Sequence, residues 1–126
     1  MKQIVITVGE QTFKASLYYT LTTNMIWKIL PVEGSAIVWG DEVYFEIPVS
    51  VDQEPDARAD VRVGELAYWP VGRAFCIFYG PTPISSGEKP RAYSPVNVIG
   101  EILDDATRLR GTQSGAAVRV IRDVIA

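Results

Sequence analysis

The chain has 126 residues, of which 48% are apolar, and its 12 basic and 15 acidic residues give a net charge of -3. A chain of this length buries roughly two-thirds of the surface that it exposes when unfolded, so we expect a single domain over residues 1–126. The negative charge and the lack of any Lys/Arg run argue against nucleic-acid binding, and no apolar stretch approaches the roughly 20 residues that a membrane span needs.

Short strands dominate the predicted secondary structure. A turn at residues 9–11 joins the first two strands as a hairpin. The clearest period lies in residues 43–51, where every second residue is apolar and the residues between them, from Glu42 on, lie on the other face of a half-buried strand. The strands predicted in chain order are residues 1–8, 12–17, 35–39, 43–51, 61–63, 66–69, 74–79, 96–103 and 117–121.

Residues 20–30 predict the main helix of the chain. Thr22, Thr23 or Asn24 is suited to cap its first turn, and Pro31 ends it. A second, one-turn helix is predicted over residues 104–110.

Two segments between the strands predict loops. Residues 52–60 are acidic and polar, as in a solvated loop. Residues 80–95 contain four prolines and two glycines, and a loop of this length in a compact domain tends to be functional or mobile.

Three segments together resemble a family of small prokaryotic cyclophilin-like proteins with no settled function. They read WGDEVYFEIP at residues 39–48, GELAYWPVGRAFCIFYGPTP at residues 64–83 and SPVNVIG at residues 94–100. The resemblance runs over nearly the whole chain. It implies a mostly β fold, a closed cyclophilin-like β-barrel with one or two short helices.

A fainter resemblance extends to the cyclophilins that are peptidyl-prolyl isomerases. Rotation about an X-Pro bond has a barrier of about 20 kcal/mol, and the isomerases' arginine lowers it by donating a hydrogen bond to the proline nitrogen. Glu46 is aligned with that arginine and cannot donate when ionised, and Ala74 or Phe75 stands at the place of the active-site glutamine. These differences argue against prolyl isomerase activity.

The residue inventory excludes several chemistries. The chain has no histidine, which removes His-based nucleophile pairs, proton shuttles and zinc sites. The single cysteine, Cys76, allows neither a thiolate cage nor an internal disulfide, which fits a cytoplasmic location. The glycines form no phosphate-binding motif. We therefore expect no metal and no cofactor.

Aromatic residues of the central strands suggest a ligand-binding groove on the barrel. Strand alternation sends half of these side chains outward, next to the Pro-rich loop. Each of these residues also has a purely structural interpretation. The aromatic rings and Cys76 would pack in the core, and Glu46 and Arg73 would be solvated surface charges. The predicted ligand-binding residues are Tyr44, Glu46, Trp69, Arg73, Phe75, Cys76 and Phe78.

Three functions fit these observations. The first is a non-catalytic module that binds a small molecule or an extended peptide in the aromatic groove. The second is an enzyme, either a weak prolyl isomerase or another carboxylate-dependent catalyst. The third is an interaction protein that buries its aromatic side chains in a homo-oligomer interface. Resemblance in fold supports none of the three by itself.

Overall fold

The computed structural model describes residues 2–124, so Met1 of the first predicted strand lies outside the described residues. The strands are β1 (Gln3–Val8), β2 (Gln11–Leu17), β3 (Val32–Ser35), β4 (Ile37–Val38), β5 (Glu42–Glu46), β6 (Arg58–Asp60), β7 (Glu65–Trp69), β8 (Ala74–Phe78), β9 (Arg91–Ile102) and β10 (Ala117–Arg122). The helices are α1 (Leu21–Ile29) and the 3-10 helix η1 (Ala106–Leu109).

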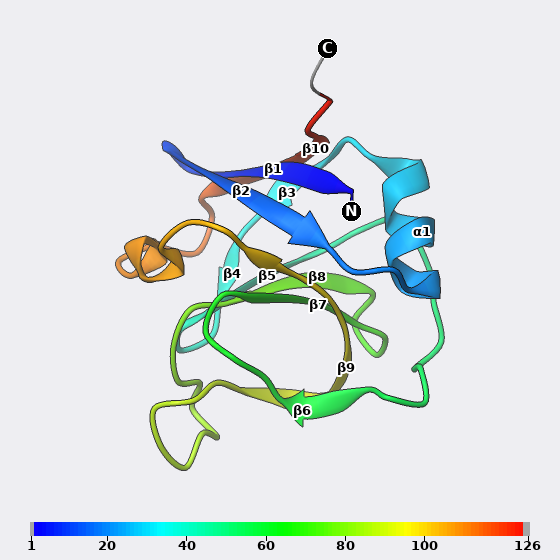
Figure 1. Cartoon of the computed structure of the whole chain (residues 1–126). Helices are drawn as coiled ribbons and strands as arrows, with labels where there is room; N and C mark the ends of the chain where they lie inside the picture. Colours follow the sequence, from blue (N-terminus) through cyan, green and yellow to red (C-terminus); the bar gives the residue numbers. More distant parts are fainter. Residues whose placement is uncertain (1, 125–126) are drawn as a thin grey trace.

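All strand pairs are antiparallel, in the order β3-β10-β1-β2-β9-β7-β8-β5-β4, and β6 pairs with β9 (Figure 1). The mostly β prediction is therefore confirmed. The closed barrel is not confirmed, because the two end strands β3 and β4 do not pair with each other in the described chain. They follow one another in sequence with only Ala36 between them, so a covalent connection stands where a barrel would have a ladder of hydrogen bonds.

The sheet encloses a main core and carries a second, smaller apolar cluster. The main core contains the largest buried side chains, among them Phe13, Phe45 and Phe75. The second cluster lies on the other face of β7 and β8, where β6 and the start of β9 cover it (Figure 1). Its buried members are Val61, Ala67, Ala74, Cys76, Phe78, Ala92 and Val96. Strand β8 is therefore buried on both faces.

Helix α1 matches its prediction except at its first turn. Thr20 is the cap, and its hydroxyl oxygen accepts a hydrogen bond from the Thr23 backbone N–H at 2.9 Å. The three residues predicted as caps lie inside the helix. Thr22 and Thr23 are buried because their hydroxyls have tertiary partners, and Thr22 accepts a hydrogen bond from the side-chain amide of Asn97 at 3.0 Å.

Several predicted strand limits were wrong. Residues 61–63 form no strand, β9 begins within the predicted Pro-rich loop, and β6 lies within the predicted acidic loop. Strand β5 ends at Glu46, although the apolar alternation continues beyond it. Segment 47–51 is instead held by the Tyr68 hydroxyl, which donates to the Val49 carbonyl at 2.8 Å and accepts from the Val51 N–H at 3.2 Å.

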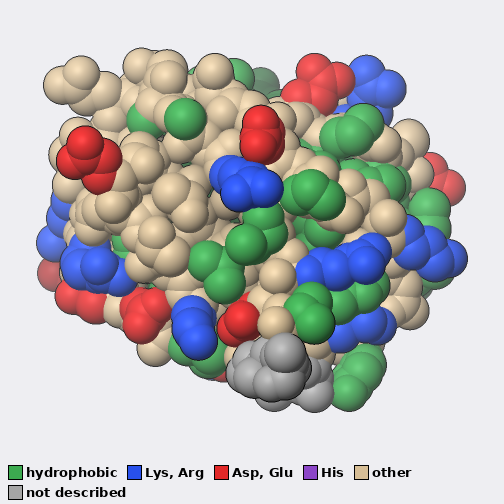
Figure 2. Space-filling model, turned by 90° about the horizontal axis from the view of Figure 1, so that it is seen from above, with side chains coloured by type: hydrophobic (Ala, Val, Ile, Leu, Met, Phe, Trp, Pro, Cys, Tyr) green, Lys and Arg blue, Asp and Glu red, His purple; other side chains and the backbone are tan. Residues whose placement is uncertain are grey.

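The surface carries mixed charge on the face shown in Figure 2, where acidic and basic side chains are interspersed. Neither helix in the described part of the chain has the length and apolar character needed to cross a lipid bilayer.

Gly100 allows β9 to pass between two neighbours, since it faces Leu17 of β2 on one side and Leu66 of β7 on the other. A Cβ atom at this position would collide with the Ser16 carbonyl oxygen, which is backbone and cannot turn away. We expect Gly100→Ala to lower the free energy of unfolding by about 1–3 kcal/mol in chemical denaturation. Gly87→Ala is the matched control, because a Cβ there meets no atom within 4 Å. Equal stability of the two variants would contradict this account.

Candidate functional site

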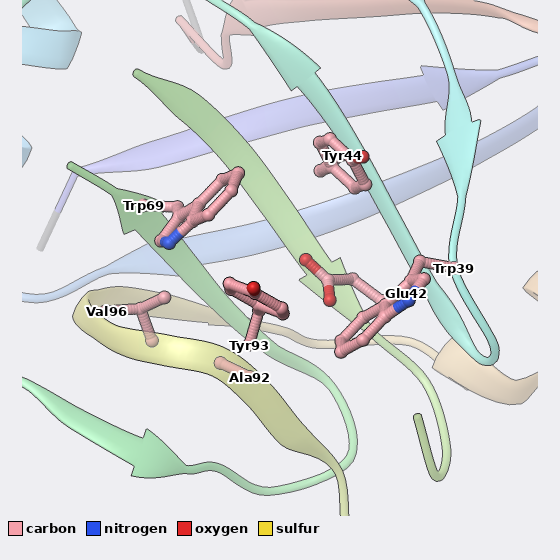
Figure 3. A pocket seen from close by; sticks show the side chains of 7 residues that line it. All are labelled: Trp39, Glu42, Tyr44, Trp69, Ala92, Tyr93 and Val96. Atoms are coloured by element: carbon pink, nitrogen blue, oxygen red, sulfur yellow. The ribbon is translucent and has the colours of Figure 1, made fainter. Parts of the chain in front are cut away.

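A cavity of about 250 Å³ opens on the outer face of β5, β8 and β7 (Figure 3). Three elements and one turn build its walls. Trp39 belongs to the turn before β5, and the other lining residues come from β5, β7 and β9. The lining residues are Trp39, Glu42, Tyr44, Trp69, Ala92, Tyr93 and Val96.

The alternation of side chains along β5 determines which of its residues face the cavity. Glu42 and Tyr44 are two residues apart and therefore share the face opposite Val43 and Phe45, which point into the main core. Tyr44 pairs with Cys76 of β8, so its side chain lies on the face of the second apolar cluster. The same alternation that fills the core thus directs an acid and an aromatic ring to the cavity.

A tight turn fixes Trp39 at the cavity mouth. The backbone N–H of Trp39 donates to the Glu42 carbonyl at 2.9 Å, and the Glu42 backbone N–H donates to the Trp39 carbonyl at 3.2 Å. Between them, Gly40 has a φ of 59°, a left-handed conformation that favours glycine. The turn is tied to the next loop, because the Asp41 carbonyl accepts from the Tyr79 N–H at 2.9 Å.

Four aromatic rings form a continuous wall in which each ring meets the next edge to face. Trp39 and Tyr93 have ring centroids 6.0 Å apart at an interplanar angle of 71°, and Tyr93 and Trp69 are 6.0 Å apart at 75°. Trp69 and Tyr44 follow at 6.1 Å and 80°. The Trp69 indole N–H donates to the Ser94 hydroxyl at 2.7 Å, which fixes this ring against β9. We call Trp39, Tyr44, Trp69 and Tyr93 the aromatic wall.

Glu42 is the one acidic or basic side chain among the lining residues, and only 5% of it is exposed. Figure 3 shows its carboxylate pointing into the space between the rings of the aromatic wall. Burial raises the pKa of Glu42 to about 7, and a hydrogen bond with the Cys76 thiol opposes this rise only in part. No Lys or Arg of the described chain forms an ion pair with it.

Glu65 is equally buried, with 1% of its side chain exposed, but its environment is the opposite. The Arg58 guanidinium donates to both carboxylate oxygens at 3.1 and 3.0 Å, and the Arg62 backbone N–H donates at 2.7 Å. Burial alone would raise the pKa of Glu65, but these partners outweigh it and the pKa is lowered. The fold therefore supplies cations to one buried carboxylate and none to the other.

The structure divides the seven predicted ligand-binding residues into three groups. Tyr44 and Trp69 line the cavity. Glu46 and Arg73 form an exposed ion pair at 3.0 Å and do not line it. The remaining three are buried packing residues: Phe75 in the main core, Cys76 and Phe78 in the second cluster behind the cavity. A binding role for any of the seven stays a prediction.

Sequence reasoning missed five of the seven residues that line the cavity. Two of the five, Ala92 and Val96, add only apolar surface, and the other three carry the carboxylate and two of the rings. Glu42 was placed with Tyr44 on the outer face of a half-buried strand but was not predicted to bind a ligand. Tyr93 fell in the predicted Pro-rich loop, and no local signal indicated that this segment begins a strand. Trp39 ends the strand predicted over residues 35–39 and was not predicted to bind a ligand.

Within residues 2–124 no three His, Cys, Asp or Glu side chains lie close enough together to hold a metal ion. The cavity offers a single carboxylate, whereas hard cations take six or more oxygen ligands.

Comparison with known proteins places the fold in a family. The chain belongs to the cyclophilin-like family, whose model matches residues 2–121. It is similar to the solution structure of a hypothetical protein from Archaeoglobus fulgidus, with 36% sequence identity and a TM-score of 0.80. The match covers 96% of this chain and 94% of the archaeal one. Comparison with curated proteins gave no match.

Glu42→Gln is expected to stabilise the protein in a pH-dependent way. Because burial raises the pKa of Glu42 from 4.5 to about 7, the folded state retains a proton that the unfolded state has lost, and stability falls as pH rises through this window. The full effect is on the order of 3 kcal/mol. The amide variant has no carboxylate to ionise and does not lose this stability. Its free energy of unfolding should therefore equal that of the native chain at about pH 4.5 and exceed it most at about pH 8.

Urea denaturation of both chains across this pH range measures that difference. The neighbouring Cys76 and Tyr79 do not titrate in the window, because burial raises the pKa of Tyr79 to about 12 and that of the thiol well above its usual value. Glu46→Gln is the control, since it removes an exposed carboxylate from the same face of β5. A pH-independent difference between Glu42→Gln and the native chain would refute the assignment.

Cys76 should be unreactive in the folded protein. It is 1% exposed, and burial raises the pKa of its thiol well above the usual value, with a further contribution from the Glu42 charge. We expect a thiol reagent at about pH 7.5 to label the native chain at least about a hundredfold more slowly than the denatured chain. Comparable rates, followed by mass spectrometry, would place the thiol in solvent contact.

Proposed function

We propose that the protein is a non-catalytic binding module that takes a small molecule into the cavity lined by the aromatic wall. The observation that carries this proposal is the pairing of an apolar, aromatic cavity with one buried carboxylate that lacks a cation. Ligand sites typically combine a mostly apolar lining with a few polar groups that set orientation.

The energetics support a ligand role better than a packing role. A buried carboxylate without a cation destabilises the fold, whereas an apolar side chain of similar size would not. Tyr93 is 71% exposed and contributes little to the core, yet its ring completes the aromatic wall between Trp39 and Trp69. An exposed aromatic ring in such a place has more to gain from a bound molecule than from water.

The enzymatic alternative has less support among the described residues. The position aligned with the isomerases' arginine is Glu46, whose carboxylate accepts a hydrogen bond from Arg73 at 3.0 Å at the surface. That carboxylate does not face the cavity lining, and it accepts where the isomerase residue donates.

A fragment screen by heteronuclear NMR tests the binding role. The chain has three tryptophans, and two of them, Trp39 and Trp69, line the cavity, while Trp27 lies on α1. Fragments that occupy the cavity should shift the indole N–H signals of Trp39 and Trp69 saturably and leave that of Trp27 in place. The library should contain cationic, neutral and anionic members, so that the result does not depend on one ligand class.

Tyr93→Ala should weaken any such binding about threefold to tenfold, the scale of one lost aromatic contact. Its matched control is Tyr19→Ala, which removes an equally exposed tyrosine that does not line the cavity. A screen without hits, or hits that shift only Trp27, would exclude the cavity as a ligand site.

A further inference from the structure

The charged groups that line the cavity favour one sign of ligand charge. Apart from two phenols, the lining holds a single ionisable group, the Glu42 carboxylate, and no Lys or Arg. Buried charges in proteins are paired as a rule, as Glu65 is by Arg58 and Arg62. Because the described residues provide no cation to Glu42, an occupant of the cavity that carries positive charge would supply the missing partner of the ionised carboxylate.

The aromatic wall favours the same sign of charge. The face of an aromatic ring carries partial negative charge and attracts a cation within about 6 Å of its centroid, most strongly for Trp. Two of the four rings in the wall are tryptophans, Trp39 and Trp69. A cavity of about 250 Å³ brings a small cation close to several of these rings at once.

The predominance of ring and apolar surface in the lining narrows the class of cation. A primary ammonium group has three N–H donors that all need acceptors when they are taken out of water. The lining offers the Glu42 carboxylate and the hydroxyls of Tyr44 and Tyr93, and its other residues present apolar or ring surface. A methylated ammonium group has few donors or none, and its methyl groups pack against rings.

We infer that the cavity binds a small organic cation of the methylated ammonium class, with its charge against Glu42 and its methyl groups against Trp39, Trp69 and Tyr93. This inference rests on the proposed binding function and specifies its ligand. A neutral or anionic molecule leaves the Glu42 carboxylate without a counter-charge and is therefore disfavoured.

A pair of isosteric probes separates charge from shape. Choline carries a trimethylammonium group, and 3,3-dimethylbutan-1-ol replaces its nitrogen by carbon with nearly the same shape and no charge. Each is titrated at about pH 8, where Glu42 is ionised, at constant ionic strength kept with sodium chloride. The indole N–H signals of Trp39 and Trp69 report occupancy, and that of Trp27 is the internal control.

We expect choline to bind at least about tenfold more tightly than the neutral alcohol. Glu42→Gln should reduce choline affinity by about tenfold or more while leaving affinity for the alcohol within about twofold. Glu46→Gln, which removes an exposed acid outside the lining, should change neither. Tyr93→Ala provides a second test at an exposed position and should weaken choline binding about threefold to tenfold.

The outcomes distinguish this inference from the proposed function. If the alcohol binds as tightly as choline, or if Glu42→Gln binds choline as well as the native chain, the cavity is a ligand site without selectivity for cations. If neither probe binds while other fragments shift Trp39 and Trp69, the ligand class is wrong and the binding function stands. If the whole screen is negative, both fail.

Discussion

The structure depends on burying strands β5, β7 and β8 between two apolar layers. Their inner faces complete the main core, while their outer faces carry the second cluster under β6 and the start of β9. Strand β9 makes this possible, because its 12 residues pair with β2, β7 and β6 in turn. The cavity lies where β6 and the start of β9 no longer cover the outer face of β5, β7 and β8. The position of the site therefore follows from the extent of the second layer.

This arrangement explains why a carboxylate can be both buried and accessible to a ligand. Glu42 lies on the outer face at the start of β5, beside the second cluster and behind the rings of Trp39 and Tyr93. The surrounding apolar groups remove it from bulk water, yet the cavity beside it is open. Glu65 lies on the adjacent strand β7 and is neutralised by two arginines from the segment that precedes it. The contrast between the two acids is electrostatic, since their exposed fractions are nearly equal.

Local patterns in the sequence predicted most of the strands, the helix and the family. The alternation from Val43 to Val51 identified the buried face correctly, because that face depends on neighbours in the chain. The opposite face was expected to be solvated, and this was wrong for Glu42 because its cover comes from residues about fifty positions further along. The closed barrel was not confirmed and Tyr93 was not predicted to line the cavity for the same reason. Both features depend on pairings between distant segments, which periodicity does not reveal.

The site also differs in electrostatic sense from the isomerases that the fold resembles. In those enzymes a cationic side chain on the strand equivalent to β5 donates a hydrogen bond toward the substrate. Here the outward face of β5 carries Glu42, Tyr44 and Glu46, and the nearby guanidinium of Arg73 is held at the surface by Glu46. The same strand face can thus attract positive charge without any change of backbone, because alternation fixes which side chains face outward and leaves their chemistry free. A cyclophilin-like scaffold can in this way keep the backbone of this strand while the charge on its outward face is reversed.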